Sequence, residues 1–317
     1  MIYDCFTFFN ELDLLEIRLN ILKDVVDKFI IIEGSKTHSG MDKPYNFDIN
    51  IFKQFEDKII YRQFDTFPPF KNAWIYENLQ RNYILEVLND FAHEEDIILL
   101  SDVDEIPNSK AILHYKKHCD GIMSLRQKMY YYFLNMQNVT EPDWDMAKIF
   151  RYKEFFNRNN NCNFVYSEYL PEEINLDVTP NKIRLMQELP ILRNGGWHFS
   201  YLGGVDKIIE KIKSFSHQEF NSEQYTSSET LIKLINAGKD IFGRDFKYKA
   251  VNIDDSFPKY LRSNREKYSH LIFKITLENI KQQKVKELKR LLKKFLITSF
   301  LLKMILKINT KLLQFLV

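Results

Sequence analysis

The N-terminal part of the chain alternates short apolar runs with stretches of helical periodicity, and this alternation constrains the fold more than any other feature. Strand-like runs occupy residues 2–9, 28–33, 58–64 and 96–101. Helical spacing of apolar residues is found at Leu15, Leu19, Leu22 and Val26, and again along residues 74–91. Strands that alternate with helices are typical of parallel sheets with crossover helices. We therefore predict a Rossmann-like α/β layer.

From about residue 121 the pattern becomes mixed. An aromatic run at residues 129–133 precedes an asparagine-rich loop at residues 157–163 and several proline breaks. No internal repeat and no Gly/Ser-rich or Pro-rich linker separates the two parts of the sequence. We predict one domain over residues 1–275, in which residues 1–120 and 121–275 form the two sides of a cleft, and a separate tail over residues 276–317.

The net charge of +2 conceals an asymmetry. Residues 281–317 contain ten Lys or Arg and a single Glu, so this tail carries +9 and the rest of the chain carries −7. An acidic body argues against nucleic acid as its partner, because phosphate backbones require a basic footprint.

The tail itself has an amphipathic pattern. Its apolar residues follow helical spacing and are flanked by lysines: Leu288, Leu291, Leu292, Phe295, Leu296, Phe300 and Leu302. This pattern predicts a basic interfacial helix on an anionic membrane surface. Residues 295–302, the longest stretch of the tail without a charge, are too few to span a bilayer. The alternative is a pair of helices that packs on protein.

Cysteine usage and the N-terminal residues bear on the compartment. The three cysteines are widely spaced and form no CxxC pair, and residues 1–9 lack the basic region and cleavage site of a signal peptide. We expect a cytoplasmic protein, peripheral on the inner face of a membrane if the tail binds lipid.

The stretch IILLSDVDEIP, residues 97–107, carries the clearest chemical signal. Four consecutive apolar residues suit a strand buried on both faces, and ligands of open α/β sheets bind beyond the carboxyl ends of such strands. Asp102, Asp104 and Glu105 stand at that edge. In extended backbone, Asp102 and Asp104 would project to the same side while Val103 turns towards the core.

Two converging carboxylates favour a divalent cation, which also takes water and substrate phosphate oxygens as ligands. This predicts a metal-dependent diphosphate site. The alternative is a solvated acidic loop with Glu105 close to the start of the helix after Pro107. The nine glycines form neither a GxxxxGK[ST] loop nor a GxGxxG turn, so these phosphate-binding devices are missing from the sequence.

Five stretches of the chain together resemble glycosyltransferase family 17. They are YDCFTFFNELDLLEIRLN, DKFIIIEGSKTHSGMDKP, ENLQRN, SDVDEIP and GGWHFSYLGG, in this order between residues 2 and 268. The family includes the eukaryotic enzymes that add the bisecting β-1,4-linked N-acetylglucosamine to N-glycans. The resemblance implies a GT-A fold, which is a Rossmann-type mixed sheet flanked by helices, with a UDP-N-acetylglucosamine (UDP-GlcNAc) donor, a divalent metal and inversion at the anomeric carbon.

Animal members of that family carry an N-terminal membrane anchor and act in the Golgi, whereas this sequence begins directly at the first predicted strand. The basic tail is a further departure. The resemblance therefore implies a carbohydrate or glycolipid acceptor without identifying it.

The resemblance points to His198 in GGWHFS as a third metal ligand beside Asp102 and Asp104. An imidazole ligand favours Mn²⁺ over Mg²⁺, because Mg²⁺ prefers all-oxygen octahedra. The alternative is a core histidine between Trp197 and Phe199.

Three further residues are expected to contact the nucleotide sugar together with Asp102 and Glu105. Glu33 ends a predicted strand, at the edge where a base and ribose would lie. Arg81 is predicted on the helix before the acidic loop, where it could hold a phosphate or the loop carboxylates. Lys43 is a candidate for the same phosphates. Each of the three could equally form a surface ion pair.

An inverting transfer needs a base that accepts the proton of the acceptor hydroxyl. Asp206, which follows Gly203 and Gly204 and opens a predicted helix, is the first candidate, although Asp at a helix start is also a common N-cap. Glu219 is the second.

Two other function classes remain open. A metal-dependent phosphotransferase or phosphatase would use Asp102 as a nucleophile, but Ile106 stands where such enzymes usually have Thr or Val. A non-catalytic carbohydrate-binding protein would explain the abundant aromatic residues alone.

Overall fold

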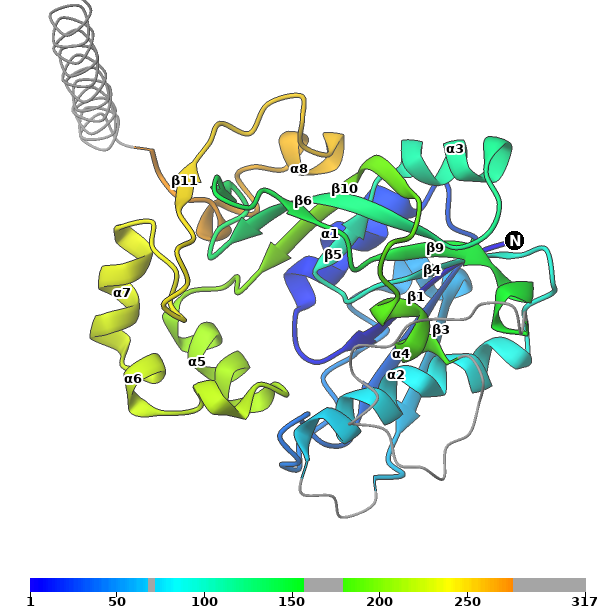
Figure 1. Ribbon diagram of the computed structural model, residues 1–317, viewed down its shortest axis with the longest axis horizontal. Coiled ribbons are helices and arrows are strands. Elements are labelled where there is room, and N and C mark those ends of the chain that lie inside the picture. Colours follow the sequence, from blue (N-terminus) through cyan, green and yellow to red (C-terminus); the bar gives the residue numbers. More distant parts are fainter. Residues whose placement is uncertain (68–71, 157–178, 276–317) are drawn as a thin grey trace, which may run out of the picture. The chain divides into compact units, whose positions relative to one another are not determined.

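The computed structural model describes residues 1–67, 72–156 and 179–275. The chain divides into two compact units, Met1–Phe273 and Lys274–Val317. The predicted tail and the asparagine-rich loop lie outside the described residues. The first unit is a mixed α/β structure with a central sheet and helices on both faces (Figure 1).

The N-terminal part forms the predicted parallel layer. Its strands are β1 (Ile2–Phe8), β2 (Lys28–Gly34), β3 (Ile59–Phe64) and β4 (Ile97–Leu100). They lie in the order β4-β1-β2-β3 and are parallel to one another. The connections include α1 (Leu12–Leu22), the short helix η1 (Lys53–Lys58) and α2 (Ala73–Asn89). The sequence prediction is confirmed for each strand to within one or two residues.

The second part of the sheet is mostly antiparallel. Its strands are β5 (Glu105–Pro107), β6 (Met123–Tyr131), β7 (Met136–Asn138), β8 (Asp143–Trp144), β9 (Lys148–Arg151), β10 (Ile191–Ser200) and β11 (Tyr248–Ala250). Strand β9 lies between β4 and β6 and is antiparallel to both. Strand β10 runs parallel to β6 and antiparallel to β5. The acidic loop between β4 and β5 is thus fixed to the parallel layer on one side and to β10 on the other.

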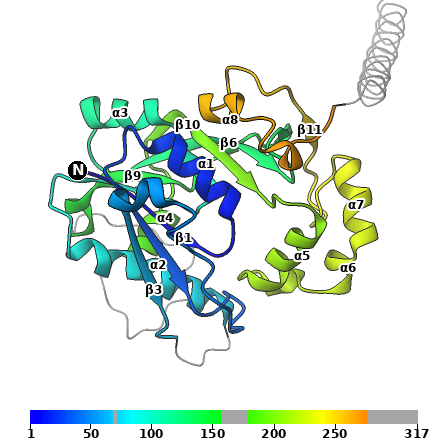
Figure 2. The same cartoon turned by 180° about the vertical axis from the view of Figure 1, so that it is seen from behind.

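Helices cover the two faces of the sheet according to the alternation of its side chains. Phe6 and Phe8 of β1 pack with α1 and α3 (Ser109–His118), whereas Tyr3 and Cys5 of the same strand pack with α2 and α4 (Pro180–Leu185). Because successive side chains of a strand point to opposite faces, β1 contributes to two separate apolar cores, one on each side of the sheet. Figure 2 shows the same layers from behind.

Smaller elements complete the first unit. They are η2 (Tyr152–Phe155), α5 (Val205–Ser214), η4 (Gln218–Phe220), α6 (Glu223–Thr226), α7 (Ser228–Asn236), α8 (Lys259–Ser263) and η5 (Ser269–Leu271). Helices α5 and α7 share an apolar core with the end of β6, through Ile208, Ile212, Leu231, Ile235 and Tyr131. In Figure 1 helices α5, α6 and α7 form a group of their own beyond the end of β10.

The two glycines before Trp197 are required by close strand packing. A Cβ on Gly196 would lie 2.1 Å from the carbonyl oxygen of Ile106 in β5, and a Cβ on Gly195 would lie 2.7 Å from the backbone of Leu125 in β6. Real Cβ atoms do not approach backbone atoms so closely. The pair therefore allows β10 to contact both neighbouring strands.

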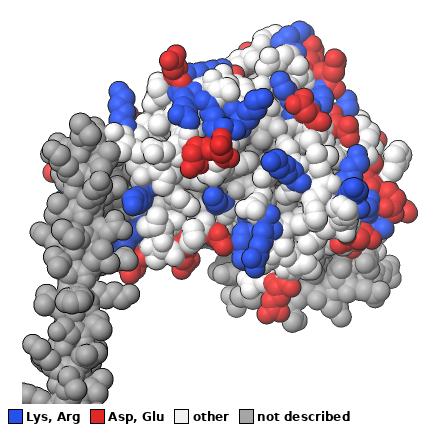
Figure 3. Space-filling view, turned by 90° about the horizontal axis from the view of Figure 1, so that it is seen from above, with Lys and Arg blue, Asp and Glu red and all other residues white. Residues whose placement is uncertain are grey.

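No helix of the described residues is long and apolar enough to cross a bilayer. On the face drawn in Figure 3, basic and acidic side chains are interspersed, so this face presents no surface of a single sign.

Candidate active site

A cavity of about 1010 Å³ opens where the parallel strands end. Residues that follow the carboxyl ends of β1, β2 and β4 line one side of it, among them Phe9, His38 and the loop Asp102–Glu105. Residues of α5 and of the segment after it also line the cavity. This is the edge at which open α/β sheets bind their ligands.

The acidic loop is a turn rather than extended backbone. Residues 103 and 104 form the turn, closed by a hydrogen bond of 3.0 Å from the Glu105 amide to the Asp102 carbonyl. Val103 is buried, as predicted, and both aspartates line the cavity. Because the backbone turns, however, the two carboxylates bind different partners, and the expectation of extended backbone here is wrong.

Arg18 of α1 binds the main chain of this loop. Its guanidinium is fully buried and forms a bidentate pair with Asp4 of β1, with N–O distances of 2.6 and 2.8 Å. It also donates to the Ser101 hydroxyl and to the carbonyls of Asp102, Val103 and Glu105. Five donors in a fixed plane suit this array of acceptors. Arg18 thereby fixes the main chain from which the carboxylates project.

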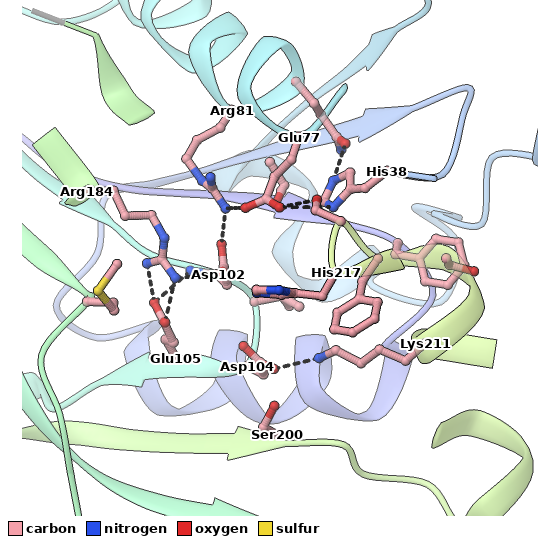
Figure 4. A pocket seen from close by; sticks show the side chains of 18 of the residues that line it. His38, Glu77, Arg81, Asp102, Asp104, Glu105, Arg184, Ser200, Lys211 and His217 are labelled. Carbon is pink, nitrogen blue, oxygen red and sulfur yellow. Dashed lines mark hydrogen bonds and ion pairs between the residues drawn. The ribbon is translucent and has the colours of Figure 1, made fainter. Parts of the chain in front are cut away.

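Two arginines bind the carboxylates of Asp102 and Glu105 (Figure 4). Asp102 accepts from Arg81 at 2.9 Å and from Arg184 at 2.6 Å. Arg184 also forms a bidentate pair with Glu105 at 2.6 and 2.7 Å. Burial alone would raise the pKa of Glu105, but the adjacent Arg184 lowers it to about 2. Glu105 is therefore an ionised anchor for Arg184.

Asp104 belongs to a second group of charges. Its carboxylate accepts from Lys211 of α5 at 2.9 Å and lies 3.7 Å from Nε2 of His198. Burial opposes ionisation, yet Lys211 and His198 hold the pKa of Asp104 well below its usual range. The His198 ring stacks on Trp144 at 4.7 Å, and its Nδ1 is buried with no hydrogen-bond partner in the described parts of the chain.

The predicted metal ligands do not gather into one group. Both Asp102 oxygens accept from arginines, whereas Asp104 accepts from Lys211 and lies beside His198. Among residues 1–67, 72–156 and 179–275, no three His, Cys, Asp or Glu side chains are placed to hold a metal ion. The side chains as arranged do not fit a three-ligand site, and we derive no step through a metal.

Glu33 and Lys43 bind each other rather than two parts of a ligand. Glu33 is fully buried and accepts from Lys43 at 2.6 Å, from the Tyr61 hydroxyl and from the amides of Asn46 and Phe47. It does not line the cavity, whereas Lys43 does. Glu33 therefore shapes the loop that follows β2, which is a structural role.

The two candidate bases also lie outside the cavity lining. Asp206 is exposed in the first turn of α5. Glu219 is exposed on η4 and accepts from Nδ1 of His217 at 2.7 Å, and His217 does line the cavity.

A sequence model described as "Glycosyltransferase family 17" matches residues 1–168. The chain belongs to this family. Two curated relatives, both named "Beta-1,4-mannosyl-glycoprotein 4-beta-N-acetylglucosaminyltransferase", come from Rattus norvegicus and Homo sapiens. Each is 23% identical over 297 residues, which cover 83% of this chain and 53% of the relative. The chain thus spans about half the length of the curated relatives it matches.

Several residues of this family 17 site were not singled out from the sequence. Arg18 had two visible signals, since it lies on the apolar face of α1 and its partner Asp4 interrupts an apolar strand. Arg184 and Lys211 had none, because their spacing to the acidic loop arises only from the fold. Glu77 is the fourth residue that was not singled out. Burial would raise its pKa, but Arg81 and His38 lower it to about 2. Its carboxylate also accepts from the Ser216 hydroxyl.

Proposed function

We propose that this chain is an inverting glycosyltransferase that moves N-acetylglucosamine from UDP-GlcNAc to a hydroxyl of a carbohydrate or glycolipid acceptor. Family membership supports transfer from a nucleotide-sugar donor. The names of the relatives, which are N-acetylglucosaminyltransferases, support the sugar. The observation that carries the proposal is the cavity at the carboxyl ends of β1, β2 and β4, with acidic and basic side chains grouped in it.

Three basic side chains of the cavity offer donors to a diphosphate. Arg81 and Arg184 are almost fully buried, and their planar guanidinium groups suit bidentate binding of phosphate oxygens. The Lys211 side chain is 29% exposed and is therefore the most accessible of the three cations. We propose that the loop carboxylates orient these cations and that the cations bind the diphosphate.

The size of the cavity supports a second substrate. Pockets that bury one drug-sized ligand measure roughly 300–1,000 Å³, and this cavity, at about 1010 Å³, is slightly larger. Aromatic side chains of its wall, among them Trp74, Phe220 and Phe242, provide apolar faces for a sugar ring. We assign this wall to the acceptor.

Lys211→Gln tests the diphosphate assignment. We expect the Kd of UDP, measured by calorimetry, to rise about tenfold or more, because the loss of one charge-assisted contact costs roughly 1.5–3 kcal/mol. The matched control is Lys207→Gln on the same helix, whose ammonium pairs with Glu210 and does not line the cavity. Equal affinities in the two variants would contradict the assignment.

The same calorimetry with GDP and CMP in place of UDP tests which nucleotide the cavity prefers. Repeating it with Mn²⁺, Mg²⁺ or EDTA tests whether binding requires a metal. We keep a divalent metal, Mn²⁺ before Mg²⁺, as a prediction from the family resemblance. Asp104→Ala is expected to abolish any metal-dependent part of UDP binding and turnover. Near-wild-type metal dependence in this variant would exclude Asp104 as a ligand.

We also propose that the basic tail, residues 281–317, holds the enzyme on an anionic membrane surface, on the cytoplasmic side. The support is the charge of +9 and the amphipathic spacing in the sequence.

A further inference from the structure

We propose that His217 is the general base of the transfer and that Glu219 positions it. This inference rests on the proposed function and adds the group that accepts the proton of the acceptor hydroxyl. It is carried by the placement of the His217 ring in the cavity wall and by the carboxylate on one of its two nitrogens.

The main chain around His217 is attached to the opposite side of the cavity. The Ser39 amide, in the loop after β2, donates to the Ser214 carbonyl at 3.1 Å, and the Ser216 hydroxyl donates to Glu77 of α2. Segment 214–217 therefore connects the end of α5 with the side built by β2 and α2. These contacts fix the backbone on which the imidazole stands.

Aromatic contacts fix the ring itself. Trp74 meets it edge to face at 4.6 Å, and Phe215 and Phe220 lie at 5.4 and 6.0 Å. His217 is still 46% exposed, and Figure 4 shows its imidazole among the side chains of the cavity. The ring is thus held in place and remains open to a substrate.

Glu219 selects the tautomer. An ionised carboxylate can only accept, so Nδ1 of His217 must donate across the 2.7 Å contact. In the neutral ring Nε2 then carries the lone pair. Among the described residues, Nε2 has no hydrogen-bond partner. A carboxylate, an imidazole and an open basic nitrogen form the arrangement by which proteins generate a base.

The other histidines of the cavity, and three of its acids, are engaged elsewhere. Glu11 accepts from the amides of Phe9 and Asn10. Glu77 and Glu105 have pKa values lowered to about 2, which makes them weak bases. His198 faces Asp104. His38 donates from Nε2 to Gln80, whose own amide donates to a backbone carbonyl, and Nδ1 of His38 faces Glu77 at 3.8 Å. The remaining ring nitrogen of His198, Nδ1, is buried. Among the described histidines of the cavity, His217 is therefore the one whose basic nitrogen neither faces an acid nor is buried.

The step is a single displacement. The acceptor oxygen forms a bond to the anomeric carbon of the donor while the bond from that carbon to the diphosphate oxygen breaks. The electron pair of the broken bond leaves with UDP, and the hydroxyl proton moves to Nε2 of His217. The imidazolium, stabilised by Glu219, then releases the proton to water.

The test uses UDP-GlcNAc with water as the acceptor. We expect His217→Gln to lower the hydrolysis rate about 10²-fold or more, the usual contribution of a general base, and to leave the Kd of UDP unchanged. In His217→Ala, added imidazole should restore part of the rate. Glu219→Gln should lower the rate less. The matched control is His270→Gln, which breaks an exposed His–Asp pair of 3.0 Å outside the cavity lining.

A second readout needs no activity. The ¹⁵N shifts of the His217 ring should report protonation at Nδ1 in the unaltered enzyme and a more even tautomer mixture in Glu219→Gln. Retained hydrolysis in His217→Gln, or protonation at Nε2 in the neutral ring, would overturn the proposal. If the unaltered enzyme bound no UDP, the proposed donor would be wrong instead. The ¹⁵N shifts of the ring would still show whether Glu219 sets the tautomer of His217.

Discussion

A single buried arginine determines the shape of the acidic loop. Arg18 and Asp4 are each fully buried, so their ion pair is screened from solvent. A charge taken out of water needs its partner and its hydrogen bonds, because removal of one partner leaves the other uncompensated. The carboxylates of the loop thus depend on a pair that does not line the cavity.

Arg18→Lys tests the role of this guanidinium group. A lysine keeps the charge but cannot supply five planar donors, so carbonyls of the loop lose their partners. We expect the free energy of unfolding, measured in urea, to fall by about 3 kcal/mol or more, together with weaker UDP binding. Arg126→Lys is the matched control, since it alters a bidentate pair with Asp145 that is 32% exposed at the arginine. That variant should lose at most about 1 kcal/mol. Equal losses would contradict the assigned role of Arg18.

At the scale of elements, β10 joins the parts of the site. It pairs with β5 through His198 and Glu105, and the Phe199 amide donates to the Asp104 carbonyl at 2.8 Å. This close approach requires Gly196, as described above. The strand therefore fixes both the loop and the histidine that faces it.

Gly196→Ala should disturb this pairing. A methyl group 2.1 Å from the Ile106 carbonyl cannot be accommodated unless β5 moves away from β10. We expect a loss of several kcal/mol in unfolding free energy, at the upper end of single substitutions. The control is Gly243→Ala, at φ +80° with nothing within 4 Å, which should cost only the roughly 1–2 kcal/mol of a left-handed conformation. A smaller loss at Gly196 than at Gly243 would show that β5 and β10 can separate freely.

Sequence reasoning found the elements and the edge that carries the site, but not the contacts within it. The four parallel strands were predicted because buried strands appear in the sequence as short runs of apolar residues. Arg184 and Lys211 could not be predicted as partners of the acidic loop, since they lie 82 and 107 residues from Asp102 and Asp104. The turn at Val103 was missed for a related reason, because carbonyls that accept from Arg18 stabilise it.

At the scale of the whole chain, the charge asymmetry separates the body from the tail. Removal of residues 281–317 should abolish co-sedimentation with vesicles of anionic lipid, because each basic residue near such a surface contributes on the order of 1 kcal/mol. Vesicles of neutral lipid and high salt serve as controls, since screening weakens the attraction. Unchanged binding of the truncated enzyme to anionic vesicles would exclude the tether.

The charged contacts of the cavity join residues that are far apart along the polypeptide. Arg18 reaches across 84 residues to the Asp102 carbonyl, and Ser216 reaches across 139 residues to Glu77. Closing such long loops costs entropy before any of these contacts can form. We therefore expect the site to assemble late in folding, after β4 has joined β1 and β10 has joined β5. A nascent or shortened chain that ends before α5 would contain the acidic loop but lack Lys211, which binds Asp104, and His217, which lines the cavity.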